Sequence, residues 1–435
     1  MDFCFVHAAD LHLDTPFEGI STASPEVGQK LRDASLDAFD ALVAFTLKEK
    51  ASFLLLAGDI YDGSERGVRA QLRFKAGLQK LSETGIRTFI AHGNHDPLDG
   101  WSAIKQWPNG VKIFNSREIE SVEVKIKQKE EEKGTTVATI YGISYKHREV
   151  KENLVKRFLK KEGTGLHIAL LHCNVGGNKN HEVYCPCSIE DLLETGMDYW
   201  ALGHIHKRQE LYEAPRIEYP GNLQGRSLKS SEREPKGALL VEANEKSIKN
   251  VNFVPLDLIR FVKCEINISK IADIDGLKKA LLENAVFLRK NNRDRGLVIR
   301  AILKGHGLLH RYLRRPGVIE DILADLRENF ETEHPFVWWD SIRDKTRAML
   351  NPHIIRLRKD FSAELINLVE DLQKKVGVKK DNTGFKEFIK IYLEDPIEKA
   401  KLGIRVPELT EKDIQDIFEQ AEYLALDLLE ETNED

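Results

Sequence analysis

Five short segments of the sequence carry side chains of the kinds that bind divalent transition metals. They are Asp10-Leu11-His12, Gly58-Asp59-Ile60-Tyr61-Asp62, Gly93-Asn94-His95-Asp96, His172 and Gly203-His204-Ile205-His206. Carboxylate oxygens, an amide oxygen and neutral imidazole nitrogens are typical ligands of such metals. Ten of the 14 histidines precede residue 207, so we expect the chemistry of this chain in its first half.

Each segment follows a short apolar run that predicts a buried strand. The runs are Phe3–Ala8, Phe53–Ala57, Thr88–Ala91, His167–Leu171 and Tyr199–Leu202. Helical spacing of apolar residues over Pro25–Lys50 and Arg66–Ser82 places helices between the first three strands, which indicates an α/β sandwich. Ligand sites of α/β sheets form at the carboxyl ends of strands, so we expect the five segments to meet.

Spacing within the segments supports one shared site. Residues i and i+2 of a strand project to the same side, so Asp10 pairs with His12, and His204 with His206. A glycine lets the backbone turn tightly or approach another segment closely. Such glycines stand immediately before three of the candidate ligands: Gly58, Gly93 and Gly203. A single Asp or His at a strand end is more often a satisfied polar group, but the complete ordered set predicts a metal site.

The ordered set DxH, GDxxD, GNHD, H and GHxH resembles the calcineurin-like metallophosphoesterases. Its details resemble the DNA exonuclease subunit branch of that family, which contains SbcD-like and YhaO-type proteins, and the match covers roughly residues 5–225. The resemblance implies a β-sandwich flanked by helices and a phosphodiester hydrolase with two divalent metal ions. The family uses Mn²⁺, although Fe or Zn would suit the same ligand types.

The resemblance also implies a role for each matching residue. The first ion would be held by Asp10, His12, Asp59 and His206, and the second by Asp59, Asn94, His172 and His204. Asp59 would bridge the ions, roughly 3.5–4 Å apart, so that they clamp a phosphodiester for in-line attack. His95 would protonate the leaving oxygen as a general acid, and Asp62 would orient its imidazole ring.

Other functions of this scaffold remain to be weighed. Phosphoprotein phosphatases carry an arginine directly after the second aspartate of GDxxD, whereas Gly63-Ser64 follows Asp62 here, so a phosphate-binding group is missing from that position. A small-molecule or nucleotide phosphodiesterase would not need further domains. A DNA-binding scaffold subunit would have no reason to keep all the ligand positions. We therefore expect a DNA nuclease, of the exonuclease kind, that acts in DNA repair.

The sequence predicts four parts. Residues 1–256 form the metallophosphoesterase domain, 258–345 a small α/β capping domain, 346–400 a helical linker region and 401–435 an acidic amphipathic helix. Within the capping domain and linker we expect strands at Phe261–Ile268, Leu297–Leu303 and Phe336–Trp339, and helices at Asp273–Leu288, Leu308–Asn329 and Ile354–Val376.

The last predicted helix begins at a capping-box-like Thr410-Glu411-Lys412-Asp413. Apolar residues then recur at three- and four-residue spacing, with acidic residues on the other face. The apolar residues are Ile414, Ile417, Phe418, Ala421, Leu424, Ala425 and Leu428. The stripe docks either on the chain's own domains or in a groove of a partner, and both alternatives stay open. The resemblance suggests an SMC-like coiled-coil ATPase of the SbcC or YhaN type as that partner.

The charge distribution permits DNA binding. The chain has a net charge of −5, but residues 401–435 hold 3 Lys or Arg against 11 Asp or Glu, so the remainder is slightly basic. Candidate contacts to DNA phosphates follow the GHxH strand, with a solvated loop as the alternative: Lys207, Arg208, Arg226 and Lys229. The resemblance further implies a homodimer built through the helices Pro25–Lys50 and Arg66–Ser82.

Composition indicates the compartment. No apolar run approaches the roughly 18 residues that a membrane span needs. The first residues, Met1 to His7, lack the basic region of a signal peptide. Five cysteines are a sparse and odd number, which suits reduced thiols. We expect a cytoplasmic protein that does not bind membranes.

Overall fold

The structure, a computed structural model, describes residues 1–13, 15, 25–63, 67–126, 134–176, 184–292, 294–330, 335–350, 352–377 and 411–432. The chain forms two compact units. The first unit contains Met1–Cys264, Glu283–Arg300 and Asp325–Ser341, and the second contains Glu265–Leu282, Ala301–Ala324 and Ile342–Asp435. Among the described residues, no helix is long and apolar enough to span a membrane.

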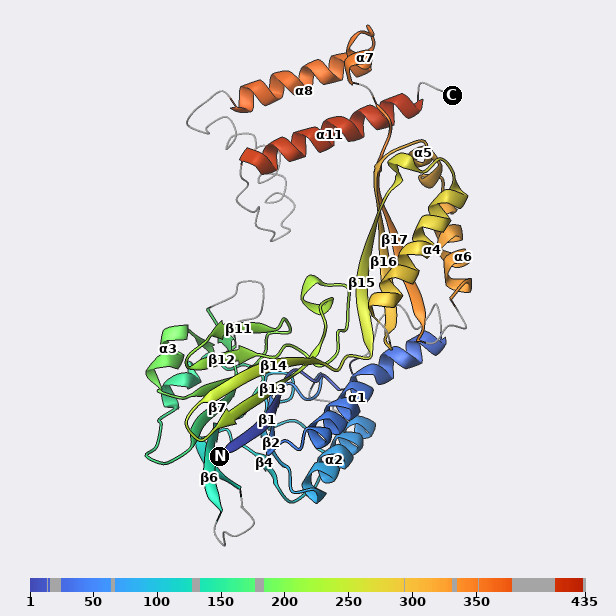
Figure 1. The fold of residues 1–435 in the computed structure, drawn as a ribbon. Coiled ribbons are helices and arrows are strands. Elements are labelled where there is room, and N and C mark those ends of the chain that lie inside the picture. The colour runs from blue at the N-terminus through green and yellow to red at the C-terminus, as the bar shows by residue number, and fades with distance from the viewer. Residues whose placement is uncertain are drawn as a thin grey trace. The chain divides into compact units, whose positions relative to one another are not determined.

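Two six-stranded sheets make up most of the first unit (Figure 1). One has the strand order β14-β13-β1-β2-β3-β4 and the other the order β11-β12-β10-β7-β6-β5. The strands of the first sheet are β1 (Asp2–Ala8), β2 (Phe53–Ala57), β3 (Arg87–Ala91), β4 (Val111–Ile113), β13 (Gly237–Asn244) and β14 (Ile248–Pro255). The strands of the second are β5 (Glu120–Ile126), β6 (Thr135–Gly142), β7 (Leu166–His172), β10 (Tyr199–Gly203), β11 (Gln209–Tyr212) and β12 (Arg216–Tyr219).

Parallel pairing at the centre of each sheet aligns the strand ends that precede the metal-binding motifs. Strands β1, β2 and β3 are parallel neighbours in the first sheet, and β6, β7 and β10 are parallel neighbours in the second. His172 at the end of β7 lies opposite Gly203 at the end of β10. The predicted ligands therefore gather at the carboxyl edge of the sheets, where α/β folds place their ligand sites.

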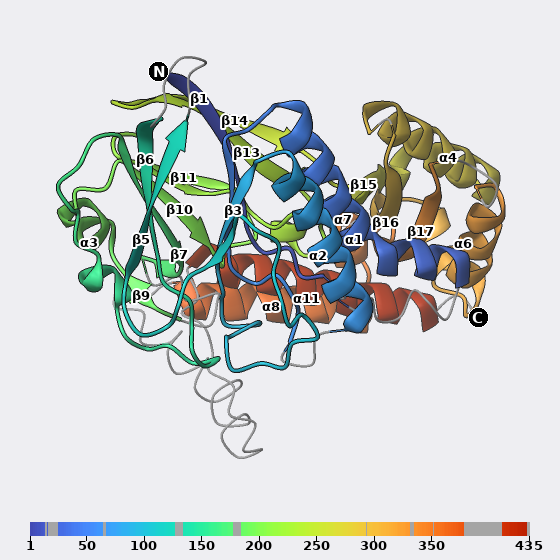
Figure 2. The ribbon, with the colours of Figure 1, turned by 90° about the horizontal axis from the view of Figure 1, so that it is seen from below.

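Alternation along the strands divides the core into layers. Phe53, Leu55 and Ala57 of β2 pack between the two sheets, whereas Leu54 and Leu56 face the helices, because successive side chains of a strand point to opposite faces. Helices α1 (Pro25–Lys48) and α2 (Val68–Glu83) lie side by side against the outer face of the first sheet (Figures 1 and 2). The 3₁₀ helix η1 (Leu154–Arg157) and helix α3 (Ile189–Glu194) cover the outer face of the second.

A third sheet has the order β15-β16-β17. Its strands are β15 (Ile259–Asn267), β16 (Gly296–His306) and β17 (Val337–Arg347), and the helices of the same stretch are α4 (Ile274–Asn291), α5 (Leu309–Leu313) and α6 (Val318–Glu328). In the first unit, Val27 and Leu31 of α1 belong to one buried cluster with Phe261 and Trp338 of this sheet.

Three sequence predictions are wrong in extent. The single helix expected over Leu308–Asn329 is broken into α5 and α6, because Pro316 cannot continue a helix and Gly317 has a left-handed φ of 86°. The helix expected over Ile354–Val376 is divided into α7 (Pro352–Arg356) and α8 (Phe361–Gly377), since the Asp360 carboxylate accepts a hydrogen bond from the amide of Ala363 and so caps a new helix. Strand β17 extends far beyond the predicted Phe336–Trp339; the later residues were missed because many of them are polar and do not continue the apolar run.

The last helix, α11 (Glu411–Thr432), begins next to the predicted capping residue. It lies beside α8 in the second unit, where its Leu426 forms a buried cluster with Ile355 and Ile366 (Figure 1). Ile417, Leu424 and Leu428 of the predicted stripe remain about half exposed. The helix is thus docked on its own chain while part of its apolar surface stays open. Residues 378–400 of the predicted linker region lie outside the described residues.

Candidate metal centre

The seven predicted metal ligands converge at the carboxyl ends of five strands. Asp10 and His12 follow β1, Asp59 follows β2, Asn94 follows β3, His172 ends β7, and His204 and His206 follow β10. The first five of these residues are at most 2% exposed, and His204 is 9% exposed. So many buried polar groups at one point require compensation by hydrogen bonds or a bound ion.

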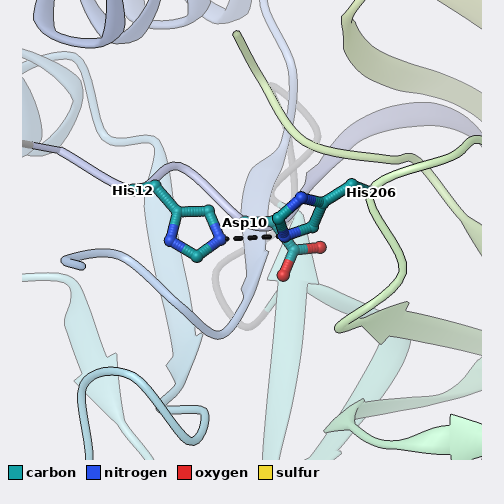
Figure 3. A group of neighbouring side chains, drawn as sticks. All are labelled: Asp10, His12 and His206. Atoms are coloured by element: carbon teal, nitrogen blue, oxygen red, sulfur yellow. Dashed lines mark hydrogen bonds between the residues drawn. The ribbon is translucent and has the colours of Figure 1, made fainter. Parts of the chain in front are cut away.

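One group of ligand atoms consists of Asp10, His12 and His206 (Figure 3). The Nε2 atoms of His12 and His206 face each other 3.0 Å apart. Nδ1 of His206 lies 2.7 Å from the Glu232 carboxylate, which can only accept, so Nδ1 carries the proton and Nε2 presents a lone pair. Burial, together with the charge of Arg226, lowers the pKa of His12 to about 4, so this ring is neutral near neutral pH. Ring nitrogens that converge in this way fit a cation between them.

A second group is centred on His172. Its Nδ1 donates to the backbone carbonyl of Ala57 at 2.9 Å, and its Nε2 lies 3.0 Å from Oδ1 of Asn94 and 3.3 Å from Oδ2 of Asp59. Although burial opposes a charge on this ring, the carboxylate of Asp59 raises the pKa of His172 to about 9. The group therefore attracts positive charge to the point where these three side chains meet.

Asp59 connects the two groups. Its Oδ2, which lies near His172, is also 3.9 Å from Nε2 of His12. Burial would raise the pKa of Asp59, but the rings of His172 and His12 outweigh it and hold the pKa well below the usual value. The carboxylate is therefore charged and lies close to both groups.

His204 and Asp10 lie where the two groups meet. The backbone amide of His204 donates to both carboxylate oxygens of Asp10 at 3.1 Å, and its ring centroid lies 5.2 Å from that of His172. Asp10 also approaches the second group, with Oδ1 4.0 Å from Nδ1 of His172. The structure thus places His204 beside the second group and Asp10 beside both.

The predicted acid and its orienting carboxylate form a pair next to these groups. Nδ1 of His95 lies 2.9 Å from Oδ1 of Asp62, and this hydrogen bond raises the pKa of His95. The side chain of His95 is 34% exposed, which makes it the most accessible of the predicted site residues apart from the candidate DNA contacts. A proton held on its exposed side could reach a substrate.

The four candidate DNA contacts lie in two different environments. Lys207 is exposed and 3.6 Å from Glu234, Arg208 stacks on the ring of Phe253 at 5.2 Å, and Lys229 is an exposed residue before the 3₁₀ helix η2 (Ser230–Glu232). Arg226 instead lies inside the site, where its Nη1 is 3.0 Å from Oδ2 of Asp62.

Sequence reasoning missed the roles of two buried carboxylates. Glu232 accepts from Nδ1 of His206 and, through Oε2, from the side chain of Asn222 and the backbone amide of Arg226. Asp96 accepts from the amides of Ile60 and Gly93, and so joins the second and third motif loops. Asp96 belongs to a recognised motif and could have been suspected, but Glu232 has no local pattern that marks it.

The backbone around the ligands is unusual for L-amino acids. Left-handed φ values occur at Asp10 (50°), His12 (44°), Asp59 (50°) and His204 (106°). Such conformations cost free energy and cluster at functional sites. The glycines that precede the ligands are needed for close approach: a Cβ on Gly203 would lie 1.8 Å from the carbonyl oxygen of Ala57.

Known proteins share these features. Residues 4–208 match the family described as calcineurin-like phosphoesterase, and residues 261–347 match the middle domain of the metallophosphoesterase YhaO. The uncharacterized metallophosphoesterase YhaO of Bacillus subtilis is 34% identical over 381 residues, which are 86% of this chain and 90% of that protein. The DNA double-strand break repair protein Mre11 of Sulfurisphaera tokodaii is 26% identical over 243 residues, 54% of this chain and 59% of that protein. The SbcD component of the nuclease SbcCD from Bacillus subtilis is 23% identical over 244 residues, 48% of this chain and 58% of that protein. The chain therefore belongs to the calcineurin-like metallophosphoesterases, in the branch of YhaO, which is related to the repair protein Mre11 and to the SbcD subunit of a nuclease.

Proposed function

We propose that the protein is a two-metal phosphodiesterase that cleaves DNA as an exonuclease in DNA repair. The observation that carries the proposal is the position of Asp59 between the His12–His206 pair and the Asn94–His172 pair. The names of the more distant relatives, a double-strand break repair protein and a nuclease component, support DNA as the substrate.

The proposed ligand set is the one expected from the motifs: Asp10, His12, Asp59 and His206 for one ion, and Asp59, Asn94, His172 and His204 for the other. Mixed nitrogen and oxygen ligands suit Mn²⁺, which we propose as the physiological metal. When bound, two such ions polarise the phosphoryl group and lower the pKa of a water molecule that attacks it.

The protein's own residues supply the remaining functions. His95 would hold a proton on the exposed side of the site and pass it to the leaving oxygen, while Asp62 keeps the ring oriented through the 2.9 Å contact. Glu232 would keep Nε2 of His206 free for a metal by binding the opposite ring nitrogen. Lys207, Arg208 and Lys229 would contact the phosphates of the DNA strand outside the reacting centre.

Two partner surfaces suit the proposal. Val68 and Leu72 of α2 are exposed. The exposed Trp101 is in a loop that is held to the same helix by the 2.7 Å hydrogen bond from the Ala103 amide to Gln71. We therefore propose this face for the homodimer.

The second unit has a larger set of exposed apolar side chains, which we propose as the docking surface for the coiled coil of an SMC-like ATPase of the SbcC or YhaN type. They are Leu308, Tyr312, Met349, Ile354, Leu357, Phe361, Leu368, Ile417, Leu424 and Leu428.

All five cysteines are free, which fits our proposal that the protein works in the reducing cytoplasm.

Digestion of end-labelled DNA tests the proposal. Purified protein loaded with Mn²⁺ should shorten single- or double-stranded DNA from its ends, and a chelator should stop the reaction. A protein that hydrolyses only small phosphodiesters and leaves every DNA substrate intact would instead be a small-molecule phosphodiesterase. A protein that binds DNA without cleaving any phosphodiester would be a scaffold subunit.

A further inference from the structure

Arg226 contacts the carboxylate that orients the proposed general acid. Its Nη1 lies 3.0 Å from Oδ2 of Asp62 and 3.1 Å from Oγ1 of Thr15, although Asp62 and Arg226 are 164 residues apart in sequence. The hydroxyl of Thr15 donates to the same Oδ2 at 3.0 Å. The other oxygen of Asp62 binds His95. One carboxylate therefore joins the arginine and the acid.

This contact supplies a charge that the motif itself lacks. Gly63 and Ser64 directly follow Asp62 in the sequence, so there is no arginine at the next position. Arg226 comes from the segment that follows β12, yet its guanidinium is next to the Asp62 carboxylate. A cation is therefore present at the second motif even though the local sequence contains none at that position.

Arg226 is also tied to the metal centre through its backbone. Its amide donates to Oε2 of Glu232 at 3.1 Å, while Oε1 of Glu232 binds the ring of His206 at 2.7 Å. The buried Glu232 thus contacts both the predicted metal ligand His206 and the backbone of Arg226. This arrangement fixes the guanidinium relative to the ligands without a direct contact between them.

The guanidinium keeps hydrogen-bonding capacity for a substrate. Its Nε is a buried atom without a hydrogen-bond partner among the described residues, whereas the side chain as a whole is 18% exposed, so the guanidinium is neither fully satisfied nor freely solvated and its exposed part can meet a ligand. Lys207 and Lys229, by contrast, have exposed side chains. Arginine presents a planar set of N–H groups that matches phosphate oxygens, and it cannot act as an acid near neutral pH.

We propose that Arg226 is a catalytic residue that binds a non-bridging oxygen of the scissile phosphate, rather than a contact to the DNA backbone elsewhere. This inference rests on the proposed phosphodiesterase function. In the reaction, the oxygen of water forms a bond to phosphorus and its proton passes to solvent, the P–O bond to the leaving group breaks, and His95 gives its proton to that leaving oxygen and regains one from solvent. Arg226 makes and breaks no covalent bond; it stabilises negative charge on the phosphoryl oxygens as the transition state forms.

The test compares Arg226→Gln and Arg226→Lys with a matched control. Arg216→Gln is suitable because the side chain of Arg216 is 19% exposed and also pairs with a carboxylate, that of Glu210, on β11. Turnover is measured on bis(p-nitrophenyl) phosphate and on end-labelled DNA, both with Mn²⁺. Metal content is measured by mass spectrometry, and the affinity for inorganic phosphate by calorimetry on the metal-loaded protein.

We expect Arg226→Gln to lower kcat by about 10²–10³ on both substrates, the usual effect of removing one charge-stabilising donor. Phosphate affinity should fall about tenfold or more, as expected for the loss of a charged hydrogen bond. Metal content and the thermal midpoint should match those of Arg216→Gln, and Arg226→Lys should recover part of the turnover because it keeps the charge.

Three results would overturn the inference. Loss of activity on DNA alone would make Arg226 a backbone contact. A loss of kcat with unchanged phosphate affinity, reproduced by Thr15→Val, would mean that Arg226 only positions Asp62. Unchanged turnover in Arg226→Gln beside an active wild type would remove any role. A wild type inert on both substrates would instead overturn the proposed function, and the inference with it.

Discussion

A buried cluster of histidine and carboxylate lies in each unit of the part of the chain that the structure describes, and the two clusters differ in how their polar atoms are satisfied. In the second unit, Nδ1 of His310 lies 2.8 Å from the hydroxyl of Thr346, and Nε2 lies 2.8 Å from the Asp427 carboxylate. Arg314 adds a 2.9 Å ion pair to Asp427. Each ring nitrogen therefore meets a complementary group, and the cluster fastens α11 to its own unit.

The cluster in the first unit leaves like groups facing each other. The Nε2 atoms of His12 and His206 approach to 3.0 Å, and Nε2 of His172 faces the oxygens of Asn94 and Asp59. Left-handed backbone at Asp10, His12 and Asp59 adds local strain that the second-unit cluster does not have at His310, Thr346 or Asp427. Buried polar groups that are complementary stabilise a fold, whereas convergent acceptors held by a strained backbone indicate a site for a cation.

The largest expected effect concerns the proton donor beside the first cluster. His95→Ala should lower kcat by about 10²–10⁴, the usual contribution of a general acid, while the metal content stays near that of the wild type. His147→Ala is the matched control because that histidine also pairs with an aspartate, Asp99, but is exposed. Steady-state kinetics and metal analysis on both variants check this. Metal loss in His95→Ala would show that this residue is a ligand.

The variant Glu232→Gln tests whether Glu232 positions the predicted metal ligand His206. The amide can no longer act as a charged acceptor for Nδ1 of His206, so we expect Mn²⁺ affinity to fall about 10- to 100-fold. Raising the Mn²⁺ concentration should restore much of the activity. The neighbouring Glu234→Gln, an exposed residue, serves as the control. Equal affinities for Mn²⁺ in the two variants, measured by calorimetry, would remove the role given to Glu232.

A substitution in the second-unit cluster should lower the stability of that unit and leave metal binding and turnover unchanged. Asp427→Asn replaces a charge that contacts His310 and Arg314, and we expect the docking of α11 to weaken by about 2 kcal/mol. Hydrogen exchange should then accelerate over Glu411–Thr432, while metal content and nuclease turnover stay unchanged. A loss of bound metal in this variant would contradict the distinction between the two clusters.

Another buried carboxylate, Glu218 of β12, lies apart from both clusters and 3.8 Å from Nη1 of Arg216. Both of its carboxylate oxygens lack a hydrogen-bond partner among the described residues, and burial raises its pKa to about 7. Because the folded state binds this proton more tightly than the unfolded state, rising pH from about 4.5 to 7 should progressively destabilise the protein. Glu218→Gln has no carboxyl group to ionise, so it should remove this loss of stability with pH. We expect it to stabilise the protein by only about 1 kcal/mol at pH 8, because the buried amide still lacks a hydrogen-bond partner. Thermal midpoints of both proteins at pH 5 and pH 8 test this, and equal shifts with pH would contradict it.

The sequence predicted the strands that carry ligands more closely than any other elements. The boundaries predicted for β2 agree with the structure, and those of β1, β3, β7 and β10 differ by a residue or so at an end, because each is a buried apolar run with a polar motif behind it. Strands β11 and β12 were not predicted, since they are four residues long and carry charged side chains. Strand β17 was underestimated for a similar reason.

Within the site, the sequence indicated which residue types would gather but not which residues would support them. The pairing of His95 with Asp62 was expected from the resemblance to the calcineurin-like metallophosphoesterases. The contacts of Glu232 with His206, and of Arg226 with Asp62, depend on how the segment after β12 folds back over the strand ends. A single glutamate or arginine in such a segment has no periodicity or spacing that would mark it.

The central claim is that the first-unit cluster binds two divalent ions through a shared Asp59. Metal-depleted protein is reloaded with Mn²⁺, and the ions bound per chain are counted by mass spectrometry for the wild type, Asp59→Asn and Asp427→Asn. We predict about two ions for the wild type and for Asp427→Asn, and fewer for Asp59→Asn, because a bridging carboxylate holds both ions. Failure of the wild type to bind Mn²⁺, or undiminished binding by Asp59→Asn, would contradict the account.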